Sequence, residues 1–209
     1  MCKLLDKVQP KNKEQLKQLI NYAFKHNIYD LNFIDTSKIT DMSYLFEYID
    51  YNFDVSSWDV SNVTNMSYMF WKCNNFNCNL SDWNVSNVTD MSHMFFYCEN
   101  FDINCFKSWD VSNVENTSYM FYNCKNFNCD LSNWDVSNVT NMTSMFAFCN
   151  KFDCDLSNWD VSNVTCMYFM FGYCKQFNCD LSHWNTSKIK NIKYMFKECN
   201  RLTIPNWYK

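Results

Sequence analysis

The most reactive side chains in this sequence are cysteines, and eleven of the thirteen fall into two rows of constant spacing. Equivalent positions of stacked repeat units lie about 4.8 Å apart with parallel Cβ vectors, whereas a disulfide needs converging Cβ atoms about 3.8 Å apart. The spacing therefore favours buried free thiols over disulfides, and the Cys-x4-Cys pairs lack the usual spacing of a zinc site. One row is Cys73, Cys98, Cys124, Cys149, Cys174 and Cys199, and the other is Cys78, Cys105, Cys129, Cys154 and Cys179.

Acidic residues also recur at fixed positions. Rows of carboxylates about 5 Å apart can hold calcium. Alternatively, the D-V-S-N segment is an Asx-type turn, in which any acceptor oxygen suffices. Asp and Asn alternate in both rows, which favours the turn, because calcium prefers the charge. The rows are Asp59, Asn84, Asp110, Asp135, Asp160 and Asn185, and Asn79, Asp130, Asp155 and Asp180.

No combination of residues in the sequence points to catalysis. His26, His93 and His183 fall at unrelated positions of the repeat, which favours surface substitutions over ligands or bases. With one glycine the chain cannot contain a P-loop, a dinucleotide-binding loop or a nucleophile elbow. We therefore expect no enzyme, no cofactor and no metal.

The charge and hydropathy of the chain argue against binding to nucleic acid and against insertion into a membrane. The formal net charge of −4 and dispersed lysines show no electrostatic footprint for nucleic acid or an anionic membrane. No run of residues is long and apolar enough for a membrane span, and the N-terminus lacks the apolar core of a signal peptide. The localisation is unknown from these features; the chain is cytoplasmic if it is complete.

A repeat of about 25 residues organises the chain. Tryptophans recur at 58, 83, 109, 134, 159 and 184, and the phenylalanine of a Met-Phe pair follows each of them twelve residues later. Met66, Met69, Phe70 and Cys73 follow the i, i+3, i+4, i+7 spacing of a short amphipathic helix, with Thr64 placed to cap it. The 129–136 segment alternates like a strand, and the extra residue between Phe101 and Trp109 indicates a bulge.

The chain ends have different patterns. In residues 12–26, Leu16, Leu19, Ile20, Ala23 and Phe24 form one apolar helical stripe behind a capping-box-like Asn12 and Gln15. We therefore expect a single right-handed α/β repeat solenoid of about seven strand–helix coils. Residues 1–28 form the N-terminal capping helix segment, residues 29–209 form the solenoid, and residues 202–209 form an aromatic lid over the last coil.

The unit S-N-V-T-N-M-x-x-M-F-x-x-C-x-x-F resembles the BspA-type leucine-rich repeat, and S-x-W-D-V-S-N-V-T-x-M is similar to its 25-residue branch in bacterial surface proteins of unknown function. The resemblance covers about residues 34–202. It implies a leucine-rich-repeat solenoid, a location at the cell surface, and adhesion or binding of host proteins.

Positions that vary between units are the better guide to binding, because stacking already explains the recurring ones. Three variable positions beside the predicted helix are rich in aromatic residues, which supply large contact areas at interfaces. One alternative is that these rings only cover one another. The candidate partner-binding ridge is Tyr68, Trp71, Phe96, Tyr97, Tyr119, Tyr122, Phe148, Phe169, Tyr173 and Tyr194.

These patterns lead us to expect a non-enzymatic scaffold that binds an unknown protein, or else a glycan. The competing hypothesis is a purely structural or self-assembling module of a larger surface polypeptide, so self-association stays open.

Overall fold

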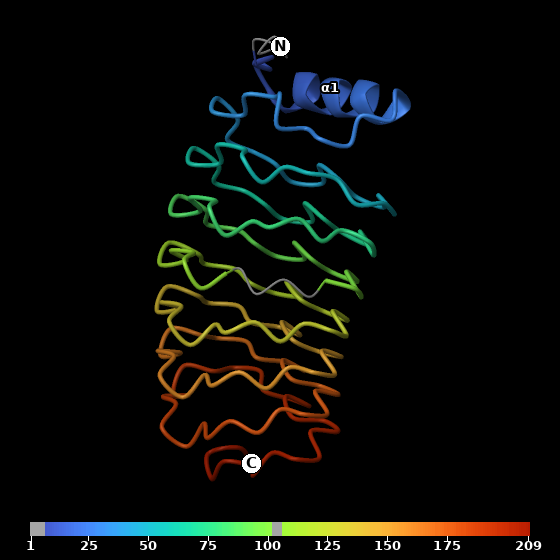
Figure 1. The fold of residues 1–209 in the computed structure, drawn as a ribbon. Coiled ribbons are helices and arrows are strands. Elements are labelled where there is room, and N and C mark those ends of the chain that lie inside the picture. Colours follow the sequence, from blue (N-terminus) through green and yellow to red (C-terminus); the bar gives the residue numbers. More distant parts are fainter. Residues whose placement is uncertain (1–6, 102–105) are drawn as a thin grey trace.

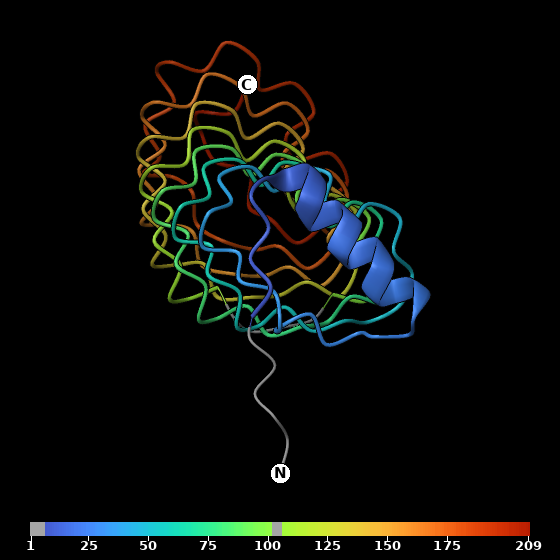
Figure 2. The same ribbon diagram turned by 90° about the horizontal axis from the view of Figure 1, so that it is seen from above.

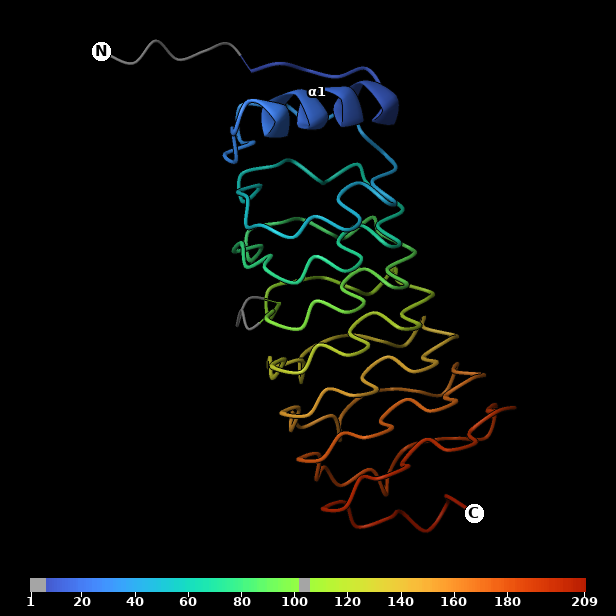
Figure 3. The ribbon, with the colours of Figure 1, turned by 90° about the vertical axis from the view of Figure 1, so that its right-hand side faces the viewer.

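The chain winds into a stack of coils, each one circuit of about 25 residues. The computed structural model describes residues 7–101 and 106–209, and successive coils lie on one another from the N-terminal to the C-terminal end (Figure 1, Figure 3). Isolated parallel bridges join equivalent residues of neighbouring coils, in the order Asp41, Asn65, Asp90, Asn116, Asn141, Cys166 and Asn191. The repeat register predicted from the sequence is thus the register of the stack.

Helix α1 (Lys13–Lys25) lies across the N-terminal end of the stack, where the sequence predicted a helix (Figure 1, Figure 2). It begins where predicted, because the Asn12 side chain accepts a hydrogen bond from the backbone N–H of Gln15 at 3.0 Å. Leu16, Ile20 and Ala23 are buried in the same apolar core as the coils, with Leu19 and Phe24 packed against its edge. The helix therefore covers apolar surface that the first coil alone leaves open.

The coils are neither helices nor strands, so the prediction of an α/β solenoid of about seven strand–helix coils is wrong. Among residues 7–101 and 106–209, α1 is the only α-helix, and the bridges between coils stay isolated instead of joining into a sheet. The leucine-rich-repeat solenoid that the resemblance implied is wrong for the same reason. The predicted bulge between Phe101 and Trp109 involves residues outside the described ranges.

The predicted helical segment, residues 66–73, is a series of overlapping turns. The N–H groups of Met69, Trp71 and Cys73 each donate to the carbonyl three residues earlier, at 3.1–3.2 Å. Tyr68 and Lys72, the third residues of two such turns, both have φ 58°, as type II turns require. A right-handed helix cannot include these residues, and Thr64 donates to the carbonyl of Thr40 instead of capping a helix.

Four other N–H groups of this segment donate to the next coil, while that of Ser67 donates to the side chain of Asn65. Each of the four donates at 2.8–2.9 Å to a carbonyl about 25 residues later, and the same pattern repeats down the stack. Four backbone hydrogen bonds of this segment are therefore made between coils, whereas a helix would keep them within the segment. The pairs in this coil are Met66 with Asp90, Tyr68 with Ser92, Phe70 with Met94, and Lys72 with Phe96.

The predicted strand between Cys129 and Val136 is also absent, although its alternation of burial is real. Cys129, Leu131, Trp134 and Val136 are buried and the residues between them lie toward solvent. The backbone N–H of Leu131 donates to the Sγ atom of Cys154 in the next coil at 3.1 Å, where a strand would have a carbonyl. The cysteine side chain thus replaces one rung of a sheet.

Phenylalanine rings stacked along the axis fill the core. Neighbouring rings of the Met-Phe row lie 5.3–5.9 Å apart with interplanar angles of 2–9°. A row of tryptophans at 58, 83, 109, 134, 159 and 184 lies beside these rings, and each indole N–H of this row donates to a carbonyl of the preceding coil, as Trp134 does to Phe106 at 2.9 Å. Trp207 continues this row by stacking on Trp184, while Tyr208 packs against Phe196.

Replacing Ser144 tests the turns directly, because this buried serine has φ 52°. In a helix, Ser144→Gly would cost roughly 0.5–1 kcal/mol. At a left-handed position it should leave the free energy of unfolding unchanged or raise it by up to about 1 kcal/mol. Ser144→Val, which forces a β-branched residue into this conformation, should lower it by about 1–3 kcal/mol. Urea unfolding measures both; destabilisation by glycine would contradict the turns.

Candidate functional site: an aromatic ridge along the stack

The candidate ridge follows the overlapping turns along one side of the stack, at three neighbouring positions of the repeat. Residues at the first and third positions have φ between 52° and 64°, so the backbone fixes the direction of their side chains. The first position is occupied by Tyr44, Tyr68, His93, Tyr119, Ser144, Phe169 and Tyr194, the second by Trp71, Phe96, Tyr122, Ala147, Gly172 and Lys197, and the third by Tyr48, Lys72, Tyr97, Asn123, Phe148, Tyr173 and Glu198.

The first position forms a continuous ring stack over the N-terminal half. Tyr44 and Tyr68 lie 4.4 Å apart, Tyr68 and His93 4.1 Å apart, and His93 and Tyr119 4.7 Å apart, all within 16° of parallel. Such pairs contribute about 0.5–1.5 kcal/mol each. A left-handed backbone costs a non-glycine residue about 1–2 kcal/mol, and the stacking offsets part of that cost.

The other two positions continue the ridge toward the C-terminus. Phe96 stacks on Tyr122 at 4.9 Å, Tyr122 meets Phe148 edge to face at 5.3 Å, and Phe148 stacks on Tyr173 at 4.9 Å. Contacts between ring rows therefore link the predicted ridge residues from coil to coil.

Small residues at the second position make room for rings of their neighbours. The Phe169 ring lies over Gly172 so closely that a Cβ atom there would be 2.6 Å from it. Ala147 is likewise buried. The apparent interruption of the aromatic row in the sequence is thus filled by an adjacent ring, and the ridge stays continuous.

Lysines frame both ends of the ridge. The Lys72 Nζ atom lies 5.1 Å from the ring centre of Tyr48, and the Lys193 Nζ atom lies 4.7 Å from that of Tyr194. These are cation–π distances. The ridge therefore presents aromatic faces along its middle and positive charge toward its ends.

The ridge is only partly covered by its own stacking. Nine of the ten predicted residues are half-buried, and Tyr194 is 45% exposed. Tyr44 and Tyr48 extend the same surface, with 38% and 55% exposure, and sequence reasoning did not include them. Alignment of Phe46 with the Met-Phe row identifies both positions, but the weak match of the first unit hid them.

His93 lies inside the ring stack, and its ionisation is altered there. Burial lowers the pKa of His93 to about 4, against a smaller opposing effect of Asp90. Its Nδ1 atom is buried and has no hydrogen-bond partner among the described residues. Charging this ring therefore opposes the folded state.

Stability should fall as pH drops from about 6.5 to about 4, because in that window the unfolded chain binds a proton that folded His93 does not. Since the ring is partly exposed, we expect a loss of about 1–2 kcal/mol by pH 4. The variant His93→Tyr, which copies Tyr68 and Tyr119, should lose this component, as urea unfolding across the pH range would show. Equal pH dependence in both proteins contradicts the assignment.

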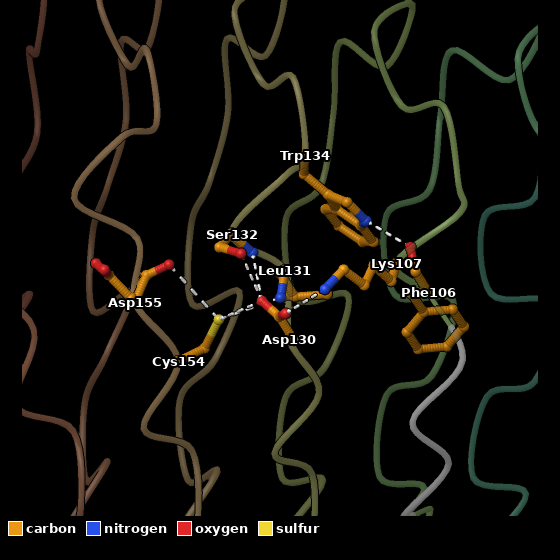
Figure 4. Close-up of polar contacts among 8 residues, drawn as sticks. All are labelled: Phe106, Lys107, Asp130, Leu131, Ser132, Trp134, Cys154 and Asp155. Atoms are coloured by element: carbon orange, nitrogen blue, oxygen red, sulfur yellow. Dashed lines mark hydrogen bonds and ion pairs between the residues drawn. The ribbon is translucent and has the colours of Figure 1, made fainter.

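The aspartate rows form Asx turns, which confirms that alternative. The Asp130 Oδ1 atom accepts from the N–H of Ser132 at 3.0 Å and from its hydroxyl at 2.6 Å (Figure 4). Together with Lys107, these bonds lower the pKa of Asp130 to about 2. Asn79 and Asn84 accept from Ser81 and Ser86 in the same way, so amide and carboxylate oxygens are interchangeable. Within residues 7–101 and 106–209, no three His, Cys, Asp or Glu side chains are grouped to hold a metal.

The inner cysteine row consists of buried free thiols, as predicted. Each Sγ–H donates to a phenylalanine carbonyl of the preceding coil, for example Cys124 to Phe95 at 3.0 Å. Burial raises the pKa of Cys73 and Cys199 to about 12, and it also raises the pKa of Cys124 well above its ordinary value. These thiols are hydrogen-bond donors of the core and have no nucleophilic character near neutral pH.

The outer row combines thiols with the aspartate turns (Figure 4). Cys154 receives the Leu131 N–H, and burial raises its pKa to about 11. The Cys179 Sγ–H donates to the Asp155 carboxylate at 3.3 Å. Cys105 lies outside the described residues. Shallow grooves of about 510 and 240 Å³ run along this face, lined mainly by hydrogen-bonded groups.

A polar groove of about 750 Å³ is a feature that sequence reasoning missed. The Asn side chain of each N-V-T segment donates to a serine carbonyl of the preceding coil, as Asn138 does to Ser112 at 2.7 Å. The Asn that recurs at this position in five successive units, from Asn62 to Asn163, signalled this ladder. The groove is lined by Asn87, Thr89, Asn113, Glu115, Asn138, Thr140 and Asn163.

Comparison with known proteins adds a family but no activity. Residues 14–116 and 100–207 each match the family model described as "Mycoplasma protein of unknown function, DUF285". No curated protein and no solved structure matches the chain. In the described part of the chain, no helix has both the length and the apolar character to cross a membrane.

Proposed function

Because the chain belongs to the DUF285 family, whose function is unknown, we propose a role from its surface: a non-enzymatic scaffold that binds another protein through the aromatic ridge. The supporting observation is a row of half-buried rings along the side of the stack, fixed by left-handed backbone positions. Rings that are already ordered lose little conformational entropy on binding, which favours affinity.

The composition of the ridge supports a protein partner. Tyrosine and tryptophan dominate the residues that contribute most to protein–protein binding, and cation–π contacts with lysine add polar recognition at the margins. The resemblance of the repeat to BspA-type surface proteins points to the same role, including adhesion. A glycan is the second class of ligand that aromatic faces can bind.

Removal of ridge rings tests the proposal. Trp71, Phe96 and Tyr122 are changed together to serine, and proteins retained from a lysate are identified by mass spectrometry. Each identified partner is then purified and its Kd measured. We expect binding to weaken at least about tenfold, the loss of one or more interface hot spots. The circular dichroism spectrum should stay unchanged, since half-buried rings are replaced.

The matched control changes three exposed apolar residues outside the ridge, Tyr22, Tyr29 and Ile204, to serine. This variant should bind as tightly as the original protein. Equal binding by the ridge variant would reject the ridge as the interface.

Light scattering after size exclusion separates the scaffold from the self-assembling module. A scaffold that binds a different protein stays monomeric at high concentration, whereas a self-assembling module grows with concentration. Growth in the original protein that the ridge variant lacks would assign the ridge to contacts between copies.

A further inference from the structure

The polar groove beside the N-V-T segments carries a row of ordered amide groups. The side chains of Asn87, Asn113 and Asn138 each donate one Nδ2 hydrogen to a serine carbonyl of the preceding coil at 2.7 Å. All three residues are exposed, and their Oδ1 atoms accept no hydrogen bond from the described residues. Each amide is therefore held in one orientation and keeps an acceptor oxygen and a second N–H hydrogen for a ligand.

A second row of polar side chains runs beside the first, two residues further along each coil. The hydroxyl groups of Thr89 and Thr140 donate to backbone carbonyls of the preceding coils at 3.2 Å, so their lone pairs remain for a ligand. Glu115 occupies the same position in the coil between them; it is exposed and forms no ion pair within the described part of the chain. The groove thus combines acceptor oxygens with a single negative charge.

The spacing of these groups follows the stack. The groove is lined by residues of four successive coils, and parallel bridges join Asp90, Asn116 and Asn141 directly beside it. Backbones joined by such bridges lie about 4.8 Å apart, whereas an extended peptide presents the same side every two residues, about 6.7 Å. A peptide laid along the groove would therefore lose register with the amides. Each sugar of an extended β-1,4-linked chain advances by about one coil, so its hydroxyl groups meet equivalent side chains in successive coils.

We propose that the polar groove binds an uncharged, extended oligosaccharide, with about one sugar to each coil. Sugar hydroxyls donate to the Asn Oδ1 atoms and to the Glu115 carboxylate, and they accept from the free amide hydrogens. The groove volume of about 750 Å³ lies within the usual range for ligand sites, roughly 300–1,000 Å³. The hydrogen-bonded side chains are ordered before a ligand arrives, which reduces the entropic cost of binding.

The lining also determines the choice of an uncharged, hydroxyl-rich ligand. Glu115 disfavours an anion, and one carboxylate supplies too little charge to select a polycation over a neutral chain. An apolar ligand would cover the amide and carboxylate groups without bonding them, and such unpaired groups are costly. The groove shares no lining residue with the aromatic ridge, so this is a second binding activity beside the one proposed above.

Isothermal titration calorimetry of the full-length protein tests the proposal with two probes, cellohexaose and chitohexaose, both uncharged β-1,4-linked hexasaccharides. We expect at least one of them to bind. Its affinity should rise from the disaccharide to the tetrasaccharide and then level off, because the groove spans four coils. Maltohexaose is the matched control ligand for cellohexaose, because its α-1,4 linkages give the same sugars a helical shape. It should bind at least about tenfold more weakly than the better probe.

A lysine in the groove should block the site. Asn138→Lys copies Lys188, which holds the equivalent position two coils later and whose Nζ atom bonds the Asn163 Oδ1 atom at 2.7 Å. The introduced side chain should occupy the Asn113 Oδ1 atom in the same way and weaken hexasaccharide binding at least about tenfold.

Two further variants separate the groove from general effects on the fold. Glu115→Thr restores the threonine that other units have at this position, and it should weaken binding about tenfold by removing the ionised acceptor. The matched control Asn133→Lys makes the same change as Asn138→Lys at an exposed residue of the same coil outside the groove. It should bind the hexasaccharide normally.

Several outcomes would overturn the proposal: no binding of either probe, equal binding of maltohexaose, or equal binding by Asn138→Lys. If the ridge variant loses the sugar while Asn138→Lys keeps it, the sugar lies on the aromatic ridge. If a lysine hexapeptide binds this groove and neither hexasaccharide does, the groove is a site for cationic peptides. Asn138→Lys should retain any protein bound by the ridge, so failure here leaves the proposed function untouched.

Discussion

Replacing Phe121 by alanine should lower the free energy of unfolding by about 3–5 kcal/mol, the range for removing a fully buried phenylalanine. Its ring is inaccessible to solvent, stacks on Phe95 at 5.7 Å and Phe146 at 5.8 Å, and lies 4.0 Å from Phe127 within its own coil. The cavity therefore weakens contacts on both sides of a central coil. Urea unfolding followed by tryptophan fluorescence measures the loss.

The control for this experiment is the same change at the end of the stack. Phe196 stacks on one ring of the Met-Phe row, Phe171, meets the terminal residues Trp207 and Tyr208 only at tilted or edge-on angles, and is 6% exposed. In a linear array each unit contacts only its neighbours, so Phe196→Ala should cost about half as much as Phe121→Ala. Equal losses at both sites would show that the coils do not behave as a linear array.

Replacing Leu16 by aspartate should detach helix α1 and lower the free energy of unfolding by about 3–5 kcal/mol, because a carboxylate cannot stay unpaired at this buried position. A free helix of 13 residues is marginal in water. The helical circular dichroism signal should therefore disappear before the tryptophan signal of the coils during unfolding.

Gln18→Asp places the same charge on the exposed face of α1 and is the matched control. It should change stability by less than about 0.5 kcal/mol. If Leu16→Asp behaves like this control, the helix does not depend on its contact with the stack.

The sequence predicts which side chains are buried better than it predicts the backbone. Met66, Met69, Phe70 and Cys73 are all inaccessible to solvent, as their helical spacing indicated. Overlapping turns also bring the chain back to one face every three or four residues, so this spacing does not distinguish turns from a helix. A helix and these turns differ in the acceptors of their backbone N–H groups. In this chain many of those acceptors lie in the next coil, about 25 residues away in the sequence, so a local pattern does not reveal them.

The sequence predicts some turn residues and misses others. Asx-type turns were expected at the rows of Asp and Asn, and those of Asp130 and Asn84 agree. The left-handed positions, however, are held mainly by tyrosine and phenylalanine, including Tyr119 and Phe169 at φ 57° and 56°. No local propensity predicts this, because the compensating ring stacks join residues about 25 positions apart. The ridge positions could be identified because their residue types vary between repeat units. The continuous contacts between rings of neighbouring coils could not be predicted.

The direction of the hydrogen bonds between coils has a consequence for synthesis. Four backbone N–H groups of each coil donate to carbonyls that lie later in the chain. In one coil these are the N–H groups of Met142, Ser144, Phe146 and Phe148, and their acceptors lie in residues 166–172. A ribosome-bound chain thus has one unsatisfied edge at every stage, and each new coil satisfies the last one while opening its own. We therefore expect folding to proceed from the N-terminus during translation, with α1 covering the first coil once that coil has formed.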